Sequence, residues 1–297
     1  MKDLVSVADL TSEEIDQLIK GALVMKKPTR QTHLEGKTIA LIFEKPSLRT
    51  RVSFDVAVSQ LGGHAVYLSP AEVGLGQREP VEDVARVMSR YVDGIVARTF
   101  SHDTVVQLAK HATVPVINGL SDYEHPCQAL SDLMTIQEKK GKLSGLTIAY
   151  VGDANNVANS LLLACAIAGV EIRIASPRGY GPGEEVLALA RKFKGQVSVT
   201  EEVVQAVNAA DVIYTDVWTS MGQEKEAAKR RKAFVRYQVN EQTLSLARTQ
   251  ALFMHPLPAH RGEEVAKGLL DSPHSVVFDQ AENRLHMQKA ILTKLVR

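Results

Sequence analysis

Short apolar runs alternate with amphipathic stretches through the first half of the chain. Residues 38–43 form an apolar run that opens with Thr38, and residues 47–61 then carry an apolar stripe at the spacing of one helical face. Strands are predicted at residues 38–43, 65–68, 94–98 and 114–117, and helices at residues 47–61, 81–91, 103–111 and 126–139. Because strands that alternate with helices pair in parallel, this half of the chain predicts a parallel sheet covered on both faces.

A second alternation of the same kind follows residues 141–145, which hold two glycines and read as an inter-domain joint. Strands are predicted at residues 147–151, 170–175, 197–200, 212–215, 251–254 and 275–278, with helical sequence at 156–168, 184–193, 201–209, 223–247 and 280–295. The pattern predicts an α/β protein of two doubly wound parallel-sheet domains, residues 1–140 and 141–279. Ligands of such folds bind beyond the carboxyl ends of the strands, so we expect the active site in a cleft between the domains.

Composition narrows the class of protein. The 297 residues are 45% hydrophobic and 23% charged, and the formal net charge is +1. A net charge so close to zero gives no positive field that would attract nucleic acid or an acidic membrane surface. Two cysteines form no disulfide framework, and the sequence has neither a signal-peptide pattern nor an apolar run long enough for a membrane span. We therefore expect a cytoplasmic protein.

The turn between the first predicted strand and helix is the first candidate site. Ser47 suits a helix N-cap, where its hydroxyl accepts a first-turn N–H. Thr50, Arg49 and Arg51 add a hydroxyl and two guanidinium groups to the positive end of the helix dipole. This turn can bind phosphate, although a capped helix with solvated arginines is the simpler interpretation of the motif alone.

Two further polar clusters follow strands of the first half. Arg98 ends a predicted strand, where ligands of α/β folds bind. His125 and Gln128 lie three residues apart at the start of a helix, so both can reach one carbonyl or amide group. Cys127 could suggest a thiol nucleophile, but it points about 100° away from its neighbours on the helix.

Polar residues also follow strands of the second half. A single glycine, Gly152, stands where a dinucleotide-binding fingerprint would need three, which argues against a nucleotide. Asn155 and Asn156 offer amides to a carboxylate, and Asp216 can hold an ammonium group. Ser220 and Met221 lie in a loop that can present backbone groups or move as a lid.

The nine histidines and two cysteines show no metal-ligand spacing, and neither a nucleophile elbow nor a P-loop is present. We therefore expect a site without metal or organic cofactor, which acts through positioning and electrostatics on small-molecule substrates.

In series, these stretches resemble the aspartate/ornithine carbamoyltransferase family, and the likeness covers the whole chain. Ser47–Arg51 is similar to the family's Ser-Thr-Arg-Thr-Arg phosphate motif, His125–Gln128 to its His-Pro-x-Gln and His255–Pro258 to its His-x-Leu-Pro. Asp216–Gly222 resembles the Ser-Met-Gly loop of the ornithine branch. Asn155-Asn156 and Asp279–Arg284 with His286 are also similar to that branch.

Two positions depart from the family pattern. Leu48 stands where the motif usually has Thr, which removes one side-chain contact but leaves the backbone N–H. Pro256 stands where ornithine enzymes usually carry Cys. Pro at this position is similar to the aspartate enzymes. The missing thiol bears on amine preference and on rate.

The resemblance implies a role for each candidate residue. Ser47, Arg49, Thr50 and Arg98 would hold the phosphate of carbamoyl phosphate, while His125, Gln128 and Arg284 would polarise its carbamoyl group. The Leu257 carbonyl would hold the carbamoyl NH₂, and Leu48, Pro126, Cys127 and Pro256 complete that binding set. Asn156 and the Met221 backbone would bind the ornithine carboxylate, and Asp216 and Ser220 its α-ammonium group.

The resemblance further implies carbamoyl transfer to ornithine in arginine metabolism, a homotrimer or a multiple of trimers, and a C-terminal helix, residues 280–297, that packs back on the first domain. Three other functions stay open. They are carbamoyl transfer to N-acylornithine, putrescine or aspartate, a catalytically silent amino-acid or phosphate-binding protein, and a nucleotide-dependent dehydrogenase, which the missing glycines oppose. The sequence leaves the anabolic or catabolic direction undetermined.

Overall fold

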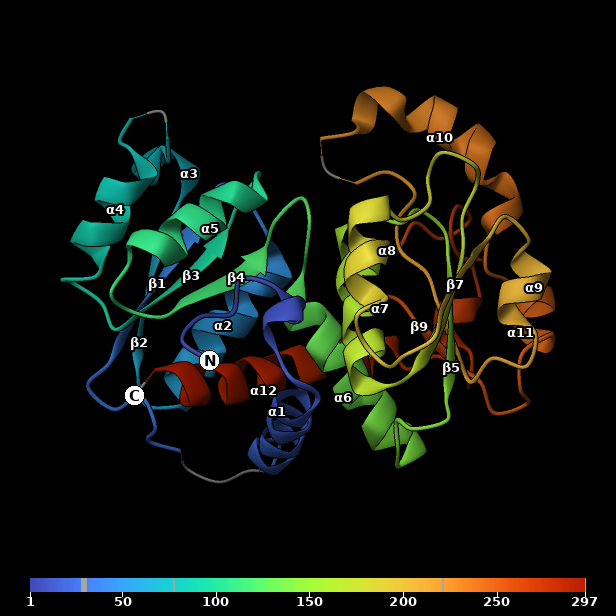
Figure 1. Ribbon diagram of the computed structural model, residues 1–297, viewed down its shortest axis with the longest axis horizontal. Coiled ribbons are helices and arrows are strands. Elements are labelled where there is room, and N and C mark those ends of the chain that lie inside the picture. The colour runs from blue at the N-terminus through green and yellow to red at the C-terminus, as the bar shows by residue number, and fades with distance from the viewer. Residues whose placement is uncertain (28–30, 77, 221, 297) are drawn as a thin grey trace. The chain divides into compact units, whose positions relative to one another are not determined.

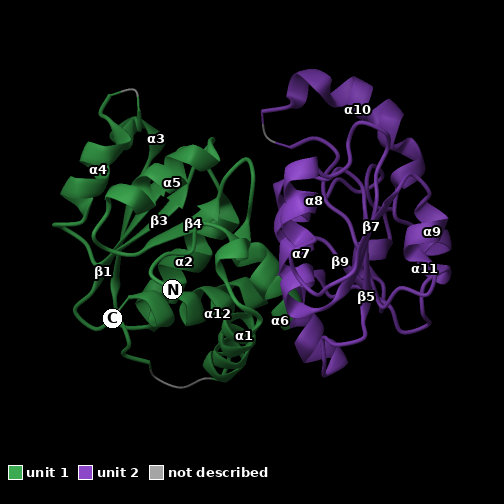
Figure 2. Cartoon of the chain, in the orientation of Figure 1, with its two compact units in different colours: residues 1–134, 283–297 green, residues 135–282 purple. Residues whose placement is uncertain are grey.

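The computed structural model describes residues 1–27, 31–76, 78–220 and 222–296. The chain forms two compact units (Figure 2). Unit 1 holds residues 1–134 and 283–297, and unit 2 holds residues 135–282. The chain passes between them within helices α6 (Pro126–Lys140) and α12 (Val277–Leu295).

Unit 1 is built on a parallel sheet of order β2-β1-β3-β4 (Figure 1). Its strands are β1 (Thr38–Phe43), β2 (His64–Leu68), β3 (Gly94–Arg98) and β4 (Val116–Leu120). The helices are α1 (Ser12–Met25), α2 (Leu48–Gln60), α3 (Pro70–Val73), α4 (Val81–Met88) and α5 (His102–His111), with a 3-10 turn η1 (Val7–Asp9) before them. Ala40 and Ile42 of β1 pack with Val105 and Leu108 of α5. Helical cover explains why β1 is apolar from Ile39 to Phe43 rather than alternating.

Unit 2 is a parallel sheet of order β7-β6-β5-β8-β9. Its strands are β5 (Thr147–Val151), β6 (Glu171–Ala175), β7 (Val197–Thr200), β8 (Val212–Tyr214) and β9 (Leu252–Met254). Its helices are α7 (Asn156–Ala168), α8 (Glu184–Ala190), α9 (Val203–Val207), α10 (Ala227–Phe234) and α11 (Glu241–Ser245), with 3-10 turns η2 (Glu224–Glu226), η3 (Val235–Tyr237) and η4 (Leu269–Asp271). The prediction of two parallel-sheet α/β domains is confirmed.

Two predicted strands differ from the structure. The strand expected at 114–117 is β4, which extends to Leu120 because the buried Asn118 pairs its backbone N–H with Leu4 and its amide with the Val5 carbonyl. The prediction of a strand at 275–278 was wrong. Ser275 makes only an isolated bridge to Phe253, and α12 begins at Val277. An apolar run this short does not by itself distinguish a strand from the buried first turn of a helix.

The polar helical stretch expected at 223–247 is broken into η2, α10, η3 and α11. Val239 leaves the helical path to bridge Val265, which interrupts the helix between η3 and α11. No helix in the described part of the chain is both long and apolar enough to cross a membrane.

Candidate active site

The turn after β1 is a capped helix start, as the sequence predicted. Ser47 has extended backbone angles, and its hydroxyl accepts the Thr50 N–H at 3.3 Å. Leu48 is 76% exposed, so its side chain contributes nothing to the core of unit 1. Thr50, by contrast, is buried and directs its hydroxyl into the unit.

Thr50 joins two guanidinium groups that are distant in the sequence. Its Oγ1 accepts from Nη1 of Arg98 at 3.4 Å and from Nη2 of Arg284 at 2.8 Å. Both arginines are buried, one at the end of β3 and one on α12. The structure therefore brings three predicted site residues together from α2, β3 and α12.

The cluster is electropositive. Burial, followed by the charges of Arg284 and Arg49, lowers the pKa of Arg98 to about 10. Within the described residues, Nε of Arg98 is buried and has no hydrogen-bond partner. Like charges gathered under partial burial favour an anion with several oxygens, which a phosphate group supplies.

Two basic residues of the same turn differ from the sequence interpretation. Arg51 stacks on the ring of Tyr67 at 3.7 Å, so it is a packed surface residue more than a phosphate ligand. Lys45 was missed. Its side chain is buried over Phe100, and burial, followed by the charge of Arg98, lowers its pKa. The signal available in the sequence was the position of Lys45, a charged residue two positions after the end of the predicted strand 38–43.

His125 and Gln128 lie buried at the start of α6. Burial, reinforced by Arg284 and Arg98, holds the pKa of His125 well below its ordinary value, so its imidazole is neutral near pH 7. Gln128 donates from Nε2 to Asp132 at 2.8 Å, which fixes its amide. A neutral imidazole and a fixed amide suit a carbonyl group.

Pro126 begins α6, and Cys127 follows it inside the core. Burial raises the pKa of the Cys127 thiol to about 12, and its sulfur lies 3.5 Å from the Asn118 carbonyl. A buried, protonated thiol is a poor nucleophile.

In unit 2, Asn155 connects α7 to the loop after β8. Its Oδ1 caps α7 by accepting from Val157 and Ala158, and its Nδ2 donates to Oδ2 of Asp216 at 2.8 Å. The role expected for Asn156, binding of the ornithine carboxylate, stays a prediction. Asn156 is the half-buried first residue of α7.

Asp216 is a buried carboxylate, and burial raises its pKa. His255, Asn155 and the Val217 N–H oppose that rise. An added cation would relieve the same cost, which suits the predicted ammonium ligand. The Ser220 N–H donates to Oε1 of Gln223 at 3.1 Å, and Met221 lies outside the described residues.

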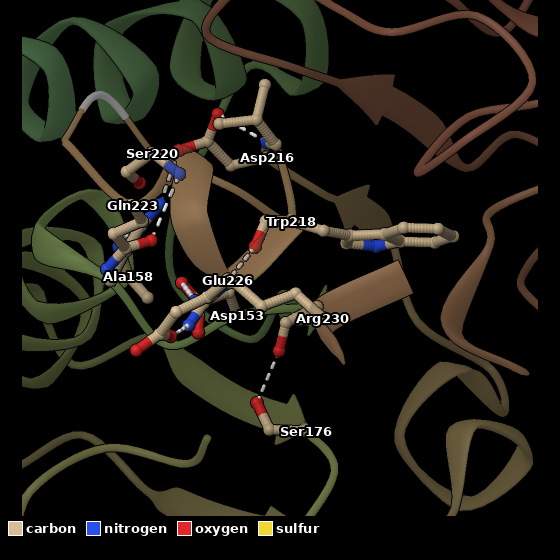
Figure 3. Close-up of polar contacts among 12 residues, drawn as sticks. Asp153, Ala158, Ser176, Asp216, Trp218, Ser220, Gln223, Glu226 and Arg230 are labelled. Carbon is tan, nitrogen blue, oxygen red and sulfur yellow. Dashed lines mark hydrogen bonds and ion pairs between the residues drawn. The ribbon is translucent and has the colours of Figure 1, made fainter. Parts of the chain in front are cut away.

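Arg230 of α10 fastens the loop that contains these residues (Figure 3). Its Nε donates to the Trp218 carbonyl at 2.5 Å, and its Nη2 pairs with the buried Asp153. Its Nη1 lies 3.6 Å from Glu226. The contact between Arg230 and Asp153 was not predicted, because the two residues are 77 positions apart in the sequence.

The turn after β9 is shaped by His255. Its Nδ1 accepts the Leu257 N–H at 3.0 Å, so the ring proton belongs on Nε2, which lies 3.3 Å from Glu264. Pro256 is buried, and Leu257 has a φ of +57°, which sets the direction of its carbonyl. The Leu257 carbonyl, which we predicted to accept from the carbamoyl NH₂, thus belongs to a turn that the buried His255 side chain holds in place.

The two units therefore carry complementary chemistry. Unit 1 offers a buried cationic and hydroxyl site beside a neutral imidazole, and unit 2 offers a buried carboxylate with a fixed backbone turn. Family models for this combination match almost the whole chain. The carbamoyl-P binding domain model matches residues 2–138, and the Asp/Orn binding domain model matches residues 144–295.

The chain belongs to the aspartate/ornithine carbamoyltransferase family. An ornithine carbamoyltransferase of Thermococcus kodakarensis is 53% identical over 301 residues, which cover 98% of this chain and 95% of the relative. The anabolic ornithine carbamoyltransferase of Pyrococcus furiosus is 54% identical over 301 residues, with the same coverage of 98% and 95%.

Solved structures give the same result. The ornithine carbamoyltransferase of Pyrococcus furiosus superposes with a TM-score of 0.96 at 52% identity, over 99% of this chain and 97% of that chain. The enzyme of Thermus thermophilus superposes with a TM-score of 0.92 at 47% identity, over 100% and 99%. The family resemblance and its ornithine branch, inferred from the motifs, are confirmed.

Proposed function

We propose that this chain transfers the carbamoyl group of carbamoyl phosphate to L-ornithine, giving L-citrulline and phosphate. The observation that carries the proposal is the Thr50 hydroxyl shared by the buried Arg98 and Arg284. An anion with several oxygens suits such a cluster of buried guanidinium groups. Relatives that are named ornithine carbamoyltransferases, above half identical over nearly the whole chain, support the substrate pair.

Carbamoyl phosphate would be held by unit 1. The Ser47 and Thr50 hydroxyls, the Leu48 N–H, Arg49 and Arg98 would bind its phosphate oxygens. His125, Gln128 and Arg284 would act on the carbamoyl oxygen, where negative charge develops during attack. Because His125 is neutral, its imidazole can donate a hydrogen bond without competing for the phosphate charge.

Ornithine would be held by unit 2. Asp216 and Ser220 would bind its α-ammonium group, and Asn156 with the Met221 backbone its carboxylate. The Leu257 carbonyl, at the turn that begins with Pro256, would accept from the carbamoyl NH₂. We assign carbamoyl-phosphate binding to residues 1–140 with helix 280–297, and ornithine binding to residues 141–279.

The reaction requires a neutral δ-amine. Its nitrogen lone pair forms a bond to the carbamoyl carbon, and the carbonyl electrons move to the oxygen. Collapse of this tetrahedral intermediate breaks the bond to the phosphate oxygen, and the amine proton leaves with phosphate or water. Positioning of two substrates contributes on the order of 7–11 kcal/mol in favourable model reactions.

We further propose a homotrimer, a cytoplasmic location and a role in arginine biosynthesis. The biosynthetic direction is supported by the Pyrococcus furiosus relative, which is named an anabolic ornithine carbamoyltransferase.

Purified protein should be mixed with carbamoyl phosphate and each of four amines: ornithine, N-acetylornithine, putrescine and aspartate. Citrulline and phosphate formed in equal amounts from ornithine alone would support the proposal and show that Pro256 is tolerated. Product from a different amine would keep the mechanism and change the substrate. No product from any amine, despite binding of carbamoyl phosphate, would favour a silent binding protein.

A further inference from the structure

A tight turn after the His255–Pro258 segment gathers three ligand-type side chains in unit 2. The Glu263 N–H donates to the His260 carbonyl at 2.9 Å, and the Gly262 N–H donates to the Val265 carbonyl at 2.7 Å. Gly262 adopts a φ of +98°, which a residue with a side chain would resist. The turn therefore brings positions 260, 263 and 264 together through its backbone.

The potential ligand atoms of this turn lie close to one another. They are Nδ1 of His260 and one carboxylate oxygen each from Glu263 and Glu264, all within 4.8 Å. His260 is exposed and Glu263 is half-buried, so an ion can reach the cluster from solvent.

Glu264 provides an independent reason to expect a ligand. It is fully buried, and its Oε1 accepts from the His260 N–H and lies 3.3 Å from Nε2 of His255. Its Oε2 is also buried and has no hydrogen-bond partner within the described residues. That oxygen lies 3.7 Å from Nδ1 of His260, a separation two ligands of one ion can take after a small adjustment.

The local charge favours a divalent cation. Arg231 pairs with one oxygen of Glu263 at 2.8 Å, which leaves the other oxygen of Glu263 and the Glu264 carboxylate for further positive charge. A donor set of one imidazole nitrogen and two carboxylate oxygens suits Zn²⁺ and related first-row ions better than Mg²⁺ or Ca²⁺, which prefer oxygen ligands only.

We propose that His260, Glu263 and Glu264 form a binding site for a first-row divalent cation such as Zn²⁺. The site would leave at least one coordination position to water. It would connect to the turn that carries the Leu257 carbonyl, because Glu264 contacts His255 and His255 accepts the Leu257 N–H. A bound ion would hold Glu264 in place and so restrict His255.

The full chain, freed of metal with a chelator, should be titrated with ZnCl₂ by calorimetry near neutral pH. A parallel titration with CoCl₂ should be followed by electronic absorption. We expect one zinc per chain and cobalt bands of a low-coordinate nitrogen and oxygen site. Both cysteines are buried and do not compete for the ion.

Two variants and one control test the ligands. His260→Ala and Glu263→Gln should each weaken zinc binding by about tenfold or more, whereas His33→Ala, at an exposed histidine of unit 1, should leave it unchanged. Glu263→Gln keeps the side-chain shape, so a folding defect in His260→Ala would not hide the answer. Equal affinity in all four proteins, or no zinc uptake by the parent, would overturn the proposal.

Discussion

At the scale of single residues, the organising side chain of unit 1 is Thr50. Its one hydroxyl accepts from both Arg98 and Arg284, so it fixes two guanidinium groups that the chain supplies from β3 and α12. Thr50 fits this position because its short side chain places Oγ1, in the first turn of α2, within reach of both guanidinium groups. Positive charge gathered here favours an anionic ligand, and this gives the first prediction.

Arg284→Met should lower kcat/KM for carbamoyl phosphate by roughly 10²–10³, the usual effect of removing one donor to a developing oxyanion. The apparent ornithine KM should change less. Steady-state kinetics with each substrate varied in turn would measure both. Arg86→Met, which removes an exposed arginine from α4, is the control. Equal kinetics for the two variants would remove Arg284 from its assigned role.

Asp216→Asn should weaken ornithine binding and stabilise the fold at neutral pH. Burial raises the pKa of Asp216, so the folded state holds this proton more tightly than the unfolded chain. A raised carboxyl pKa means that stability falls as pH rises from the unfolded pKa through the folded one. The neutral amide avoids that loss and cannot pair with an ammonium group.

Thermal unfolding of Asp216→Asn at acid and at neutral pH, with ornithine kinetics, tests both parts. The gain in Tm over the parent should be present at neutral pH and shrink at low pH. An unchanged ornithine KM would contradict the binding role, even if Tm rose.

At the scale of elements, Arg230 fastens α10 to the loop after β8. Arg230 contacts the Trp218 carbonyl and the buried Asp153, and its guanidinium lies 4.9 Å from the ring centre of Tyr180 (Figure 3). Despite this partner, burial raises the pKa of Asp153 to about 6. The pair is therefore costly to separate, and it holds the loop that carries Asp216 and Ser220.

Arg230→Ala should destabilise unit 2 by about 3–5 kcal/mol, because it leaves Asp153 buried and unpaired. Denaturant unfolding would measure this loss, with Arg191→Ala in the exposed pair with Glu184 as control. Arg230→Lys should keep a charge but lose the forked contact, so its ornithine KM should rise more than its KM for carbamoyl phosphate. Similar losses in both Ala variants would contradict the interpretation.

Close packing between α7 and the segment before β7 gives a separate stability prediction. A Cβ at Gly195 would lie 2.6 Å from the Ala166 Cα and 2.8 Å from the Cys165 carbonyl oxygen. Gly195→Ala should therefore destabilise by about 1–3 kcal/mol, as overpacking does. Gly183→Ala meets nothing within 4 Å and should be near neutral. The denaturant concentrations at the unfolding midpoints of the two variants and the parent would measure both effects on stability.

At the scale of the whole molecule, the pH dependence of turnover should follow the substrate amine. His125 is already neutral near pH 7 because its pKa is well below the ordinary value, so it gains no further activity on deprotonation. kcat/KM for ornithine should rise about tenfold per pH unit below the amine pKa. A pH profile that instead levelled off near an ordinary histidine pKa would implicate an enzyme group.

The sequence by itself determined the α/β class, the family and most of the residues that follow strand ends. Strand and helix periods are local, and motifs such as Ser47–Arg51 keep their spacing along the chain. Pairing at Thr50, the Arg230 contact with Asp153 and the role of Asn155 were decided only by the tertiary structure, because each joins segments far apart in sequence. The start of α12 at Val277, in place of a predicted strand, was decided there too, since a short apolar run satisfies its backbone equally well in a strand or in a buried helical turn.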